Sequence, residues 1–155
     1  MNAAVNAFFL ILKLLSLYFL VVSLFSLCKH KMQKSSTTQR RFAVLIAARN
    51  EESCIAGLIE SLLAQNYPSE LFDIWVLPNN CTDHTADAAR HAGGKVLEMP
   101  TSIHSKGAAL QYAANTLLHG SRYYDAFCVF DADNEVDPAF LSEMNQALSR
   151  SAIVK

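Results

Sequence analysis

Two carboxylates one residue apart follow an apolar run in the C-terminal part of the chain. The stretch reads FCVFDADNEVDP, and Asp131 and Asp133 come directly after Phe130. In an extended segment, residues i and i+2 point to the same side. Such a pair could hold one hard cation that also contacts phosphate oxygens, as Mg²⁺ sites commonly do. The alternative is a solvated turn, because Asp and Asn are frequent in loops.

Two other kinds of acidic site can be compared with this stretch. A calcium loop of the EF-hand type needs Gly at its sixth position and Glu at its twelfth. Counted from Asp131, these positions hold Val136 and Ser142, so the EF-hand interpretation fails. A phosphatase with an aspartyl nucleophile also carries Asp-x-Asp after a strand, normally the first one and followed by Gly-Thr. Here Asn134 and Glu135 follow, after the fourth predicted strand.

A cation and a glycine, Lys106 and Gly107, stand at the start of a predicted helix. This combination suits a diphosphate, through charge and close backbone approach, although an ordinary helix start fits equally well. No P-loop and no G-x-G-x-x-G is present, so nicotinamide binding has no support. Of the five histidines, only His104, in the loop before this helix, stands out as a site candidate.

The elements that must position these residues alternate between strands and helices. Continuous apolar runs predict buried strands, and apolar residues at i, i+3, i+4 and i+7 predict helices between them. The strands are expected at 42–48, 72–77, 95–99 and 125–130, and the last helix is expected to be capped by Asp137. Such alternation predicts an α/β fold with a parallel, doubly wound sheet, which binds ligands at the carboxyl ends of its strands. The stretches ARNEE, PNNCTD, TSIHSKG and DAD fall at those ends.

The N-terminal segment 7–27 is apolar except for Lys13 and three serines. Its length matches a hydrocarbon core of about 30 Å, which predicts one transmembrane helix. A cleaved signal peptide is disfavoured by the long apolar run and by the lack of a basic n-region and an A-x-A site. The basic segment 28–40 is expected to be a juxtamembrane linker, and 41–155 a single domain. The positive-inside rule places that domain in the cytoplasm, at the cell (inner) membrane.

Overall composition excludes some function classes. The 155 residues are 52% apolar and 17% charged, with a formal net charge of −1. No global basic field therefore points to nucleic acid as a partner. The four cysteines lack metal-ligand spacing and fit a reducing compartment better than a disulfide framework.

In combination these segments resemble the family 2 glycosyltransferases, which have a Rossmann-like GT-A fold. The resemblance covers about residues 41–150, and four segments carry it in order: VLIAARNEESCIAGLIESLLAQNYP, IWVLPNNCTDHTADAA, SKGAALQYA and VFDADNEVDPAFL. It implies inverting transfer of a sugar from a nucleotide-diphosphate donor, with a UDP-sugar favoured. The predicted membrane anchor is similar to that of members that make polysaccharides or glycolipids. The acceptor would then be saccharide or lipid-linked, and membrane lipid would be a further partner.

The resemblance also implies roles for individual residues. Asp131 would lie near the ribose or uridine, and Asp133, with Asp131 beside it, would bind Mg²⁺ or Mn²⁺ on the diphosphate. The residues that would contact the rest of the donor are Ala47, Asn50, Glu51 and Lys106. Many members have an Asp after the second strand that accepts a hydrogen bond from the base. Here that position is Asn79, whose side-chain oxygen can still accept.

An inverting enzyme needs a general base to deprotonate the acceptor hydroxyl. In the resembled family this carboxylate follows the Asp-x-Asp segment, and processive members also carry Q-x-x-R-W there. Both are expected beyond Lys155, so no catalytic residue is assigned and the domain is expected to be a truncated donor half. The alternatives are a non-catalytic nucleotide-binding remnant or half of a split enzyme.

Overall fold

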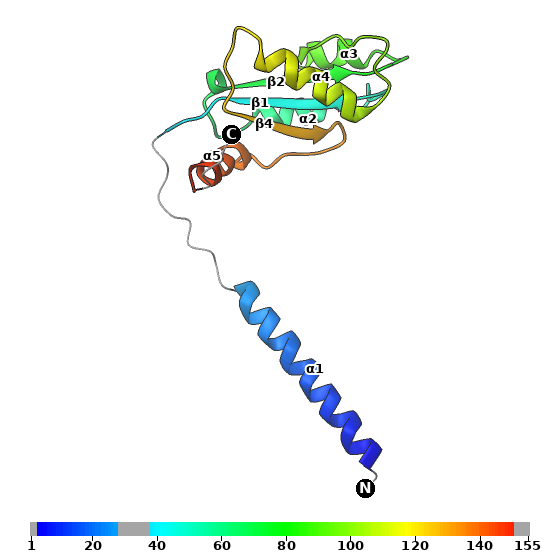
Figure 1. Ribbon diagram of the computed structural model, residues 1–155, viewed down its shortest axis with the longest axis vertical. Helices are drawn as coiled ribbons and strands as arrows, with labels where there is room; N and C mark the ends of the chain where they lie inside the picture. The colour runs from blue at the N-terminus through cyan, green and yellow to red at the C-terminus, as the bar shows by residue number, and fades with distance from the viewer. Residues whose placement is uncertain (1–2, 28–37, 151–155) are drawn as a thin grey trace. The chain divides into compact units, whose positions relative to one another are not determined.

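The computed structural model describes residues 3–27 and 38–150, and the chain divides into two compact units, Met1–Lys34 and Ser35–Lys155. The first unit contains helix α1, Ala3–Leu27 (Figure 1). Within the described residues, no helix is long and apolar enough to cross a membrane. The transmembrane span predicted for 7–27 is therefore not confirmed. Most of the predicted linker 28–40 lies outside the described residues.

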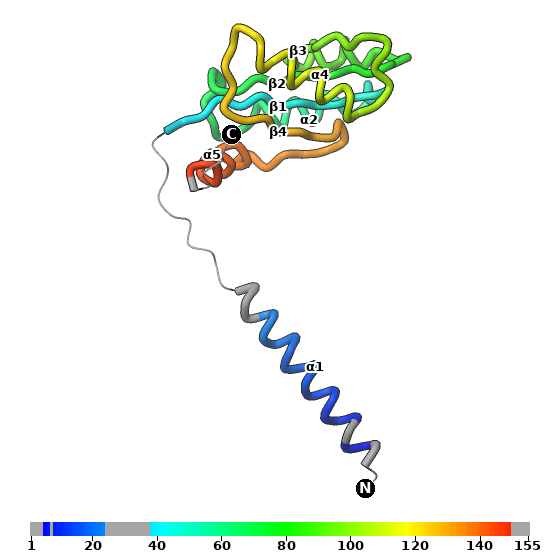
Figure 2. Tube along the Cα trace, viewed as in Figure 1, coloured from blue at the N-terminus to red at the C-terminus, as the bar shows by residue number. Residues whose placement is uncertain are grey.

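The second unit is built on a parallel sheet of four strands in the order β3-β2-β1-β4. The strands are β1 Phe42–Ala48, β2 Phe72–Pro78, β3 Lys95–Val96 and β4 Ala126–Asp131. The chain steps outward from β1 to β3 and then returns to the other side of β1, so β1 lies between β2 and β4 (Figure 2). The order of the strands therefore reverses at the boundary between β1 and β4.

Helices cover both faces of the sheet. They are α2 Ile55–Leu63, α3 Thr85–His91, α4 Lys106–Leu118 and α5 Phe140–Arg150, with a short 3-10 turn, η1 Ser69–Leu71. One apolar cluster contains residues of α2, α3 and α5, and a second contains residues of α4 (Figure 1). The return from β3 to β4 reverses direction along the sheet. A right-handed crossover then requires α4 to lie on the face opposite α2 and α3.

Strand β1 supplies both apolar clusters, as its unbroken apolar sequence predicts. Val44 and Ile46 pack on the α2 face, Ala43 and Leu45 pack on the α4 face, and all four are at most 1% exposed. Burial of a Leu or Ile side chain stabilises a fold by roughly 1.5–3 kcal/mol. The burial of β1 on both faces fixes its carboxyl end at the centre of the sheet.

Helix α5 is joined to α2 through a buried amide. Gln65, at 7% exposure, donates from Nε2 to the Asp137 carbonyl at 2.7 Å and accepts from the Leu141 amide at 2.9 Å. Asp137 was predicted to cap this helix; the helix begins at Phe140, and Asp137 Oδ1 accepts from the Ala139 amide at 2.8 Å in the turn just before it. These bonds hold the segment that follows β4 against the domain.

The elements agree with the sequence pattern except at the edge of the sheet. The strand predicted at 95–99 is only Lys95–Val96, and the last bond to β2 runs from the Leu97 amide to the Val76 carbonyl at 2.9 Å. The segment then enters the loop through Pro100, which cannot donate to a ladder. Gly93, with φ of 96°, ends α3 in the left-handed conformation expected of a helix stop.

Candidate functional site

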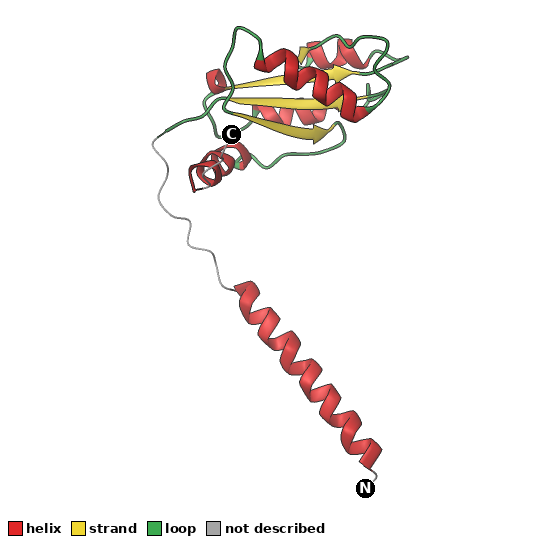
Figure 3. Cartoon of the chain, in the orientation of Figure 1, coloured by secondary structure: helices red, strands yellow, loops and turns green. Residues whose placement is uncertain are grey.

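The carboxyl ends of β1, β2 and β4 lie side by side at one edge of the sheet. The arrowheads of the longer strands point to the same edge (Figure 3). Ala47 of β1 is in register with Leu77 of β2 and with Asp131 of β4. This edge includes the reversal of strand order between β1 and β4, where open α/β sheets bind their ligands.

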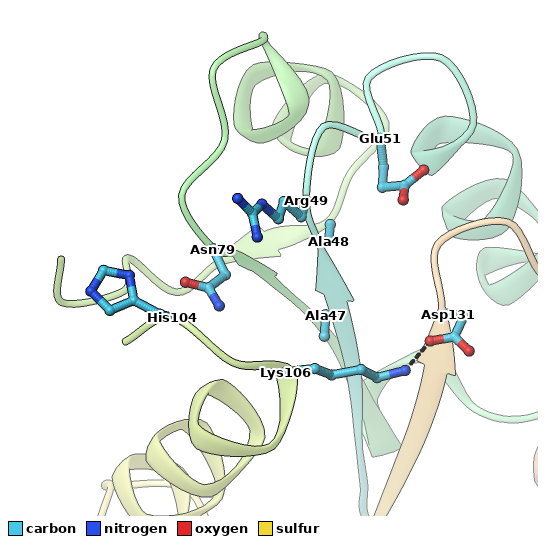
Figure 4. A pocket seen from close by; sticks show the side chains of 8 residues that line it. All are labelled: Ala47, Ala48, Arg49, Glu51, Asn79, His104, Lys106 and Asp131. Atoms are coloured by element: carbon cyan, nitrogen blue, oxygen red, sulfur yellow. Dashed lines mark hydrogen bonds and ion pairs between the residues drawn. The ribbon is translucent and has the colours of Figure 1, made fainter. Parts of the chain in front are cut away.

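A cavity of about 320 Å³ opens at this edge. Its volume is at the lower end of the roughly 300–1,000 Å³ that small-molecule sites occupy. The residues that line it are Ala47, Ala48, Arg49, Glu51, Asn79, His104, Lys106 and Asp131 (Figure 4). Five of the six predicted donor-binding residues are therefore brought together around one cavity, and Asn50 is the exception.

An ion pair joins two predicted site residues. Nζ of Lys106, the first residue of α4, donates to Oδ1 of Asp131, the last residue of β4 (Figure 4). Ser105 caps α4 by accepting from the Ala108 amide at 3.2 Å, as a helix start requires. Both charged side chains are about half exposed, at 49% and 60%, so a ligand can reach them.

Asn50 shapes the site from outside the cavity lining. It has a left-handed backbone, with φ of 58°, and its Oδ1 accepts from the Thr82 amide at 2.8 Å. The next residue, Glu51, donates from its amide to Thr85 Oγ1 at 2.9 Å. The segment after β1 is thus bonded to the segment after β2, and this holds the backbone of Glu51 in place.

Asp83 strengthens the same loop contact. It accepts from Thr85 Oγ1 at 2.5 Å and from the Glu52 amide at 3.1 Å. The Thr85 hydroxyl is the main reason that the pKa of Asp83 lies below its usual value. A carboxylate that accepts several hydrogen bonds stays ionised more readily.

Asn79 is the buried polar residue of the cavity. It is only 7% exposed, and its backbone amide donates to the Ala48 carbonyl at 2.9 Å. The side chain lies between Arg49 and His104 in Figure 4. A buried polar group has little access to water and needs another hydrogen-bond partner, so such groups fix the orientation of a bound ligand.

Sequence reasoning missed Arg49 and left His104 without a role. Arg49 directly follows β1, and this position at a strand end could have marked it as a candidate site residue. His104 comes from the loop before α4, and its Nδ1 lies 3.4 Å from Nδ2 of Asn80. That contact joins segments 24 residues apart, which residue spacing along the chain does not reveal.

Asp133 lies apart from Asp131. The chain turns at 132–133, the Asn134 amide donates to the Asp131 carbonyl at 3.1 Å, and Ala132 is buried. Asp133 therefore lines a second cavity, of about 470 Å³, with Cys54, Gly57, Leu58, Glu60, Ser61, Asn134 and Glu135. The expected extended segment, with both carboxylates on one side, is not what the structure forms.

Cys54 connects the two cavities. Its thiol donates to Oε2 of Glu51, 3.1 Å away. Burial, and then this carboxylate, raise the pKa of the Cys54 thiol to about 11. At neutral pH the thiol is protonated, so Cys54 is not poised as a nucleophile.

The fit to a divalent metal is partial. In the described part of the chain, no three His, Cys, Asp or Glu side chains form a group that could hold a metal ion. A Mg²⁺ ion needs only one or two carboxylates when phosphate oxygens supply further ligands. Asp131 meets that minimum in the first cavity, whereas the predicted Asp131 and Asp133 pair is divided between two cavities.

The first cavity combines several binding groups. Arg49 and Lys106 supply positive charge for phosphate oxygens. Ala47 and Ala48 supply a small apolar surface, and Asn79 supplies a buried amide. This set suits a ligand that carries an anionic group and a polar edge that can hydrogen-bond to an amide.

Comparison with family models gives a match to glycosyl transferase family 2 over residues 43–154. Two curated relatives are named as beta-monoglucosyldiacylglycerol synthases. The protein from Nostoc sp. is 40% identical over 43 residues, which are 28% of this chain and 9% of the relative. The protein from Synechocystis sp. is 29% identical over 51 residues, which are 33% of this chain and 11% of the relative. The matched stretch is thus about a tenth of these relatives.

Solved structures share the fold. A mannosyltransferase, PcManGT from Pyrobaculum calidifontis, in complex with GDP-Man and Mn²⁺, has a TM-score of 0.65 at 18% identity. The similarity covers 85% of this chain and 39% of that one. TarS from S. aureus, in complex with UDP, has a TM-score of 0.58 at 21% identity, over 71% of this chain and 32% of the other. The parallel sheet with helices on both faces matches the Rossmann-like GT-A fold.

Proposed function

Since this chain belongs to glycosyl transferase family 2, we propose that its first cavity binds the nucleotide-diphosphate sugar from which a glycosyl group is transferred. One observation carries the proposal. Five predicted residues, from β1, β4, the loops after β1 and β2 and the start of α4, line a single cavity at the edge where strand order reverses. We favour a UDP-sugar, because solved structures of the same fold contain UDP.

The positions of the charged residues in the cavity suggest how the donor is oriented when it binds. Lys106 and Arg49 would bind the diphosphate, where negative charge develops as the nucleotide leaves. Lys106 already forms an ion pair with Asp131, so the incoming phosphates would compete for its ammonium group. The base would lie against Ala47 and Ala48, with its edge toward Asn79.

A divalent metal, Mg²⁺ or Mn²⁺, is a further part of the proposal. Asp131 would contribute a carboxylate from within the cavity, and a ligand role for Asp133 stays a prediction. When bound, the metal would neutralise charge on the departing diphosphate. Of the structures with this fold, the Pyrobaculum mannosyltransferase contains Mn²⁺.

We also propose that transfer inverts the anomeric carbon and that the acceptor is lipid-linked or a saccharide. A lipid-linked or saccharide acceptor is supported by the names of the curated relatives, which describe synthesis of a glucosyl diacylglycerol.

Membrane attachment through residues 7–27, with the domain in the cytoplasm, is a separate proposal. It is supported by large apolar side chains exposed along α1, such as Phe8, Leu12 and Phe19. Carbonate extraction of membranes from expressing cells tests attachment, and protease protection tests orientation.

A second candidate is a nucleotide-binding chain that transfers no sugar by itself, as a remnant or as half of a split enzyme. The observation that favours it is the separation of Asp131 and Asp133 into two cavities. Sugar transfer by the purified chain from a radiolabelled UDP-sugar to a lipid or saccharide acceptor would exclude this candidate.

Calorimetric titration of UDP into the purified full-length chain, with and without Mn²⁺, tests the proposed function. We expect saturable binding that is weakened by Lys106→Met and strengthened by the metal. Absence of binding by UDP, GDP and CDP to the folded chain would overturn it.

A further inference from the structure

The orientation of the Asn79 side-chain amide is determined by a chain of hydrogen bonds that begins at a backbone carbonyl. The carbonyl oxygen of Ile103 can only accept, and it lies 2.7 Å from the side-chain amide of Asn80. Asn80 must therefore present its nitrogen, Nδ2, at this contact. The assignment of oxygen and nitrogen in an amide rests on such partners.

The same Nδ2 of Asn80 lies 2.8 Å from the side chain of Asn79. Two amide nitrogens cannot face each other, since both would donate, so Asn79 presents its oxygen, Oδ1, to Asn80. The two hydrogens of Asn80 Nδ2 are then accounted for by Ile103 and Asn79. Asn80 holds this geometry with a left-handed backbone, φ 54°, which Asn tolerates better than most residues.

The nitrogen of Asn79 is left for the cavity. Within 38–150, Nδ2 of Asn79 forms no hydrogen bond, and every buried side-chain nitrogen or oxygen described there has a partner. Nδ2 is therefore reached from the cavity, although the residue is only 7% exposed. In Figure 4 the oxygen of Asn79 points toward the His104 side, and its nitrogen points toward Ala47 and Lys106.

We propose that Asn79 reads the donor's nucleobase as a hydrogen-bond donor, and that Asn80 positions it for this role. The recognised group is an acceptor on the base edge, either a carbonyl oxygen or an unprotonated ring nitrogen. The sequence expectation, that the side-chain oxygen of Asn79 accepts from the base, stays a prediction; the present proposal concerns Nδ2, which forms no hydrogen bond in the described residues while the oxygen accepts from Asn80. This inference rests on the proposed nucleotide site.

Asn79→Asp separates the two polarities. Aspartate has the same shape, can still accept from Asn80, and cannot donate at neutral pH. We expect it to weaken UDP and CDP binding about tenfold or more, because an anionic oxygen would face an acceptor in a buried site. Asn79→Ala is expected to weaken binding less, since it removes the bond without adding repulsion.

Calorimetric titration of UDP and CDP into the native and variant full-length chains gives the readout, and thermal melting checks folding. Tighter binding of UDP would assign the acceptor to a carbonyl oxygen, whereas tighter binding of CDP would assign it to the ring nitrogen. If Asn79→Asp bound UDP as tightly as the native chain, the inference would be overturned and the nucleotide site would stand. If the native chain bound no nucleotide, both the inference about Asn79 and the proposed nucleotide site would be overturned.

Asn80→Gly tests the positioning role, because glycine keeps the positive φ and removes the amide that orients Asn79. We expect UDP affinity to fall several-fold although Asn80 does not line the cavity. In a chain that carries Asn80→Gly, the loss of UDP affinity caused by Asn79→Asp should also be smaller. An unchanged penalty would show that Asn80 does not orient Asn79 for binding.

Discussion

Lys106 and Asp131 form an ion pair that joins the start of α4 to the end of β4, across the mouth of the cavity. They are 25 residues apart in sequence. Their contact follows from the crossover that brings α4 back over β1. The pair is half exposed, so its importance is expected to lie in ligand binding rather than in stability.

Lys106→Met should therefore separate affinity from stability. We expect the free energy of unfolding to change by less than about 1 kcal/mol, as for other exposed ion pairs. UDP affinity should fall at least about tenfold, because a charge-assisted bond to phosphate is lost. Arg90→Met is the matched control, since Arg90 forms exposed ion pairs with Asp87 and Glu98 and does not line the cavity. Equal affinities of the two variants would contradict the assignment of Lys106 to the diphosphate.

Asp73 should stabilise the domain in a pH-dependent manner. It is 6% exposed and accepts from Lys95 at 2.7 Å, from Arg122 at 3.2 Å and from Tyr124 at 2.7 Å. Burial opposes its ionisation, but the bonds from Lys95 and Tyr124 outweigh this and lower the pKa of Asp73. Asp73→Asn is expected to cost about 1–3 kcal/mol at pH 7.

The sign of this effect follows from linkage. Because the folded pKa of Asp73 is below the unfolded value of about 3.9, its contribution is present above that value. It is lost as the pH falls through the lower, folded pKa. The melting temperatures of native and Asp73→Asn chains should therefore differ at pH 7 and converge in stronger acid. A difference that is constant with pH would contradict this account.

Cys54 and Cys128 should react slowly with iodoacetamide. Burial raises the pKa of each thiol to about 11, and Cys54 also donates to Glu51. At pH 8 a thiol with that pKa is about 0.1% thiolate. In a chain with Cys28 and Cys81 replaced by Ser, Glu51→Gln should speed alkylation of Cys54 and leave Cys128 unchanged. Mass spectrometry of the alkylated peptides measures both rates, and equal acceleration of the two would point to general loosening instead.

Gln65→Leu should destabilise the joint between α2 and α5. It leaves the buried Leu141 amide without its partner, at a cost of about 1–3 kcal/mol, whereas the Asp137 carbonyl loses one bond and keeps the one from the Phe140 amide at 3.0 Å. Gln146→Leu, at a half-buried position on α5, is the matched control. Hydrogen exchange should show faster exchange of the first turn of α5 in Gln65→Leu. Unchanged protection there would show that the apolar contacts of Leu141 suffice.

Much of the fold could be predicted from the sequence, because strands and helices follow from local patterns. The buried run 42–48 agrees with the structure, and the last helix begins within three residues of its predicted cap, Asp137. The strand at 95–99 was predicted too long, since the end of an edge strand depends on its neighbour and not on its own residues alone.

The sequence by itself also determined which residues stand at the strand ends, and hence that Asn79, Lys106 and Asp131 would meet. Alternating elements and right-handed crossovers leave few ways to arrange them. Only the tertiary structure decided how these side chains are directed. The turn after β4 separates Asp133 from Asp131, and contacts from Ile103 and Asn80 fix the amide of Asn79. The physical reason is that a loop side chain takes its direction from hydrogen bonds to segments that are remote in sequence.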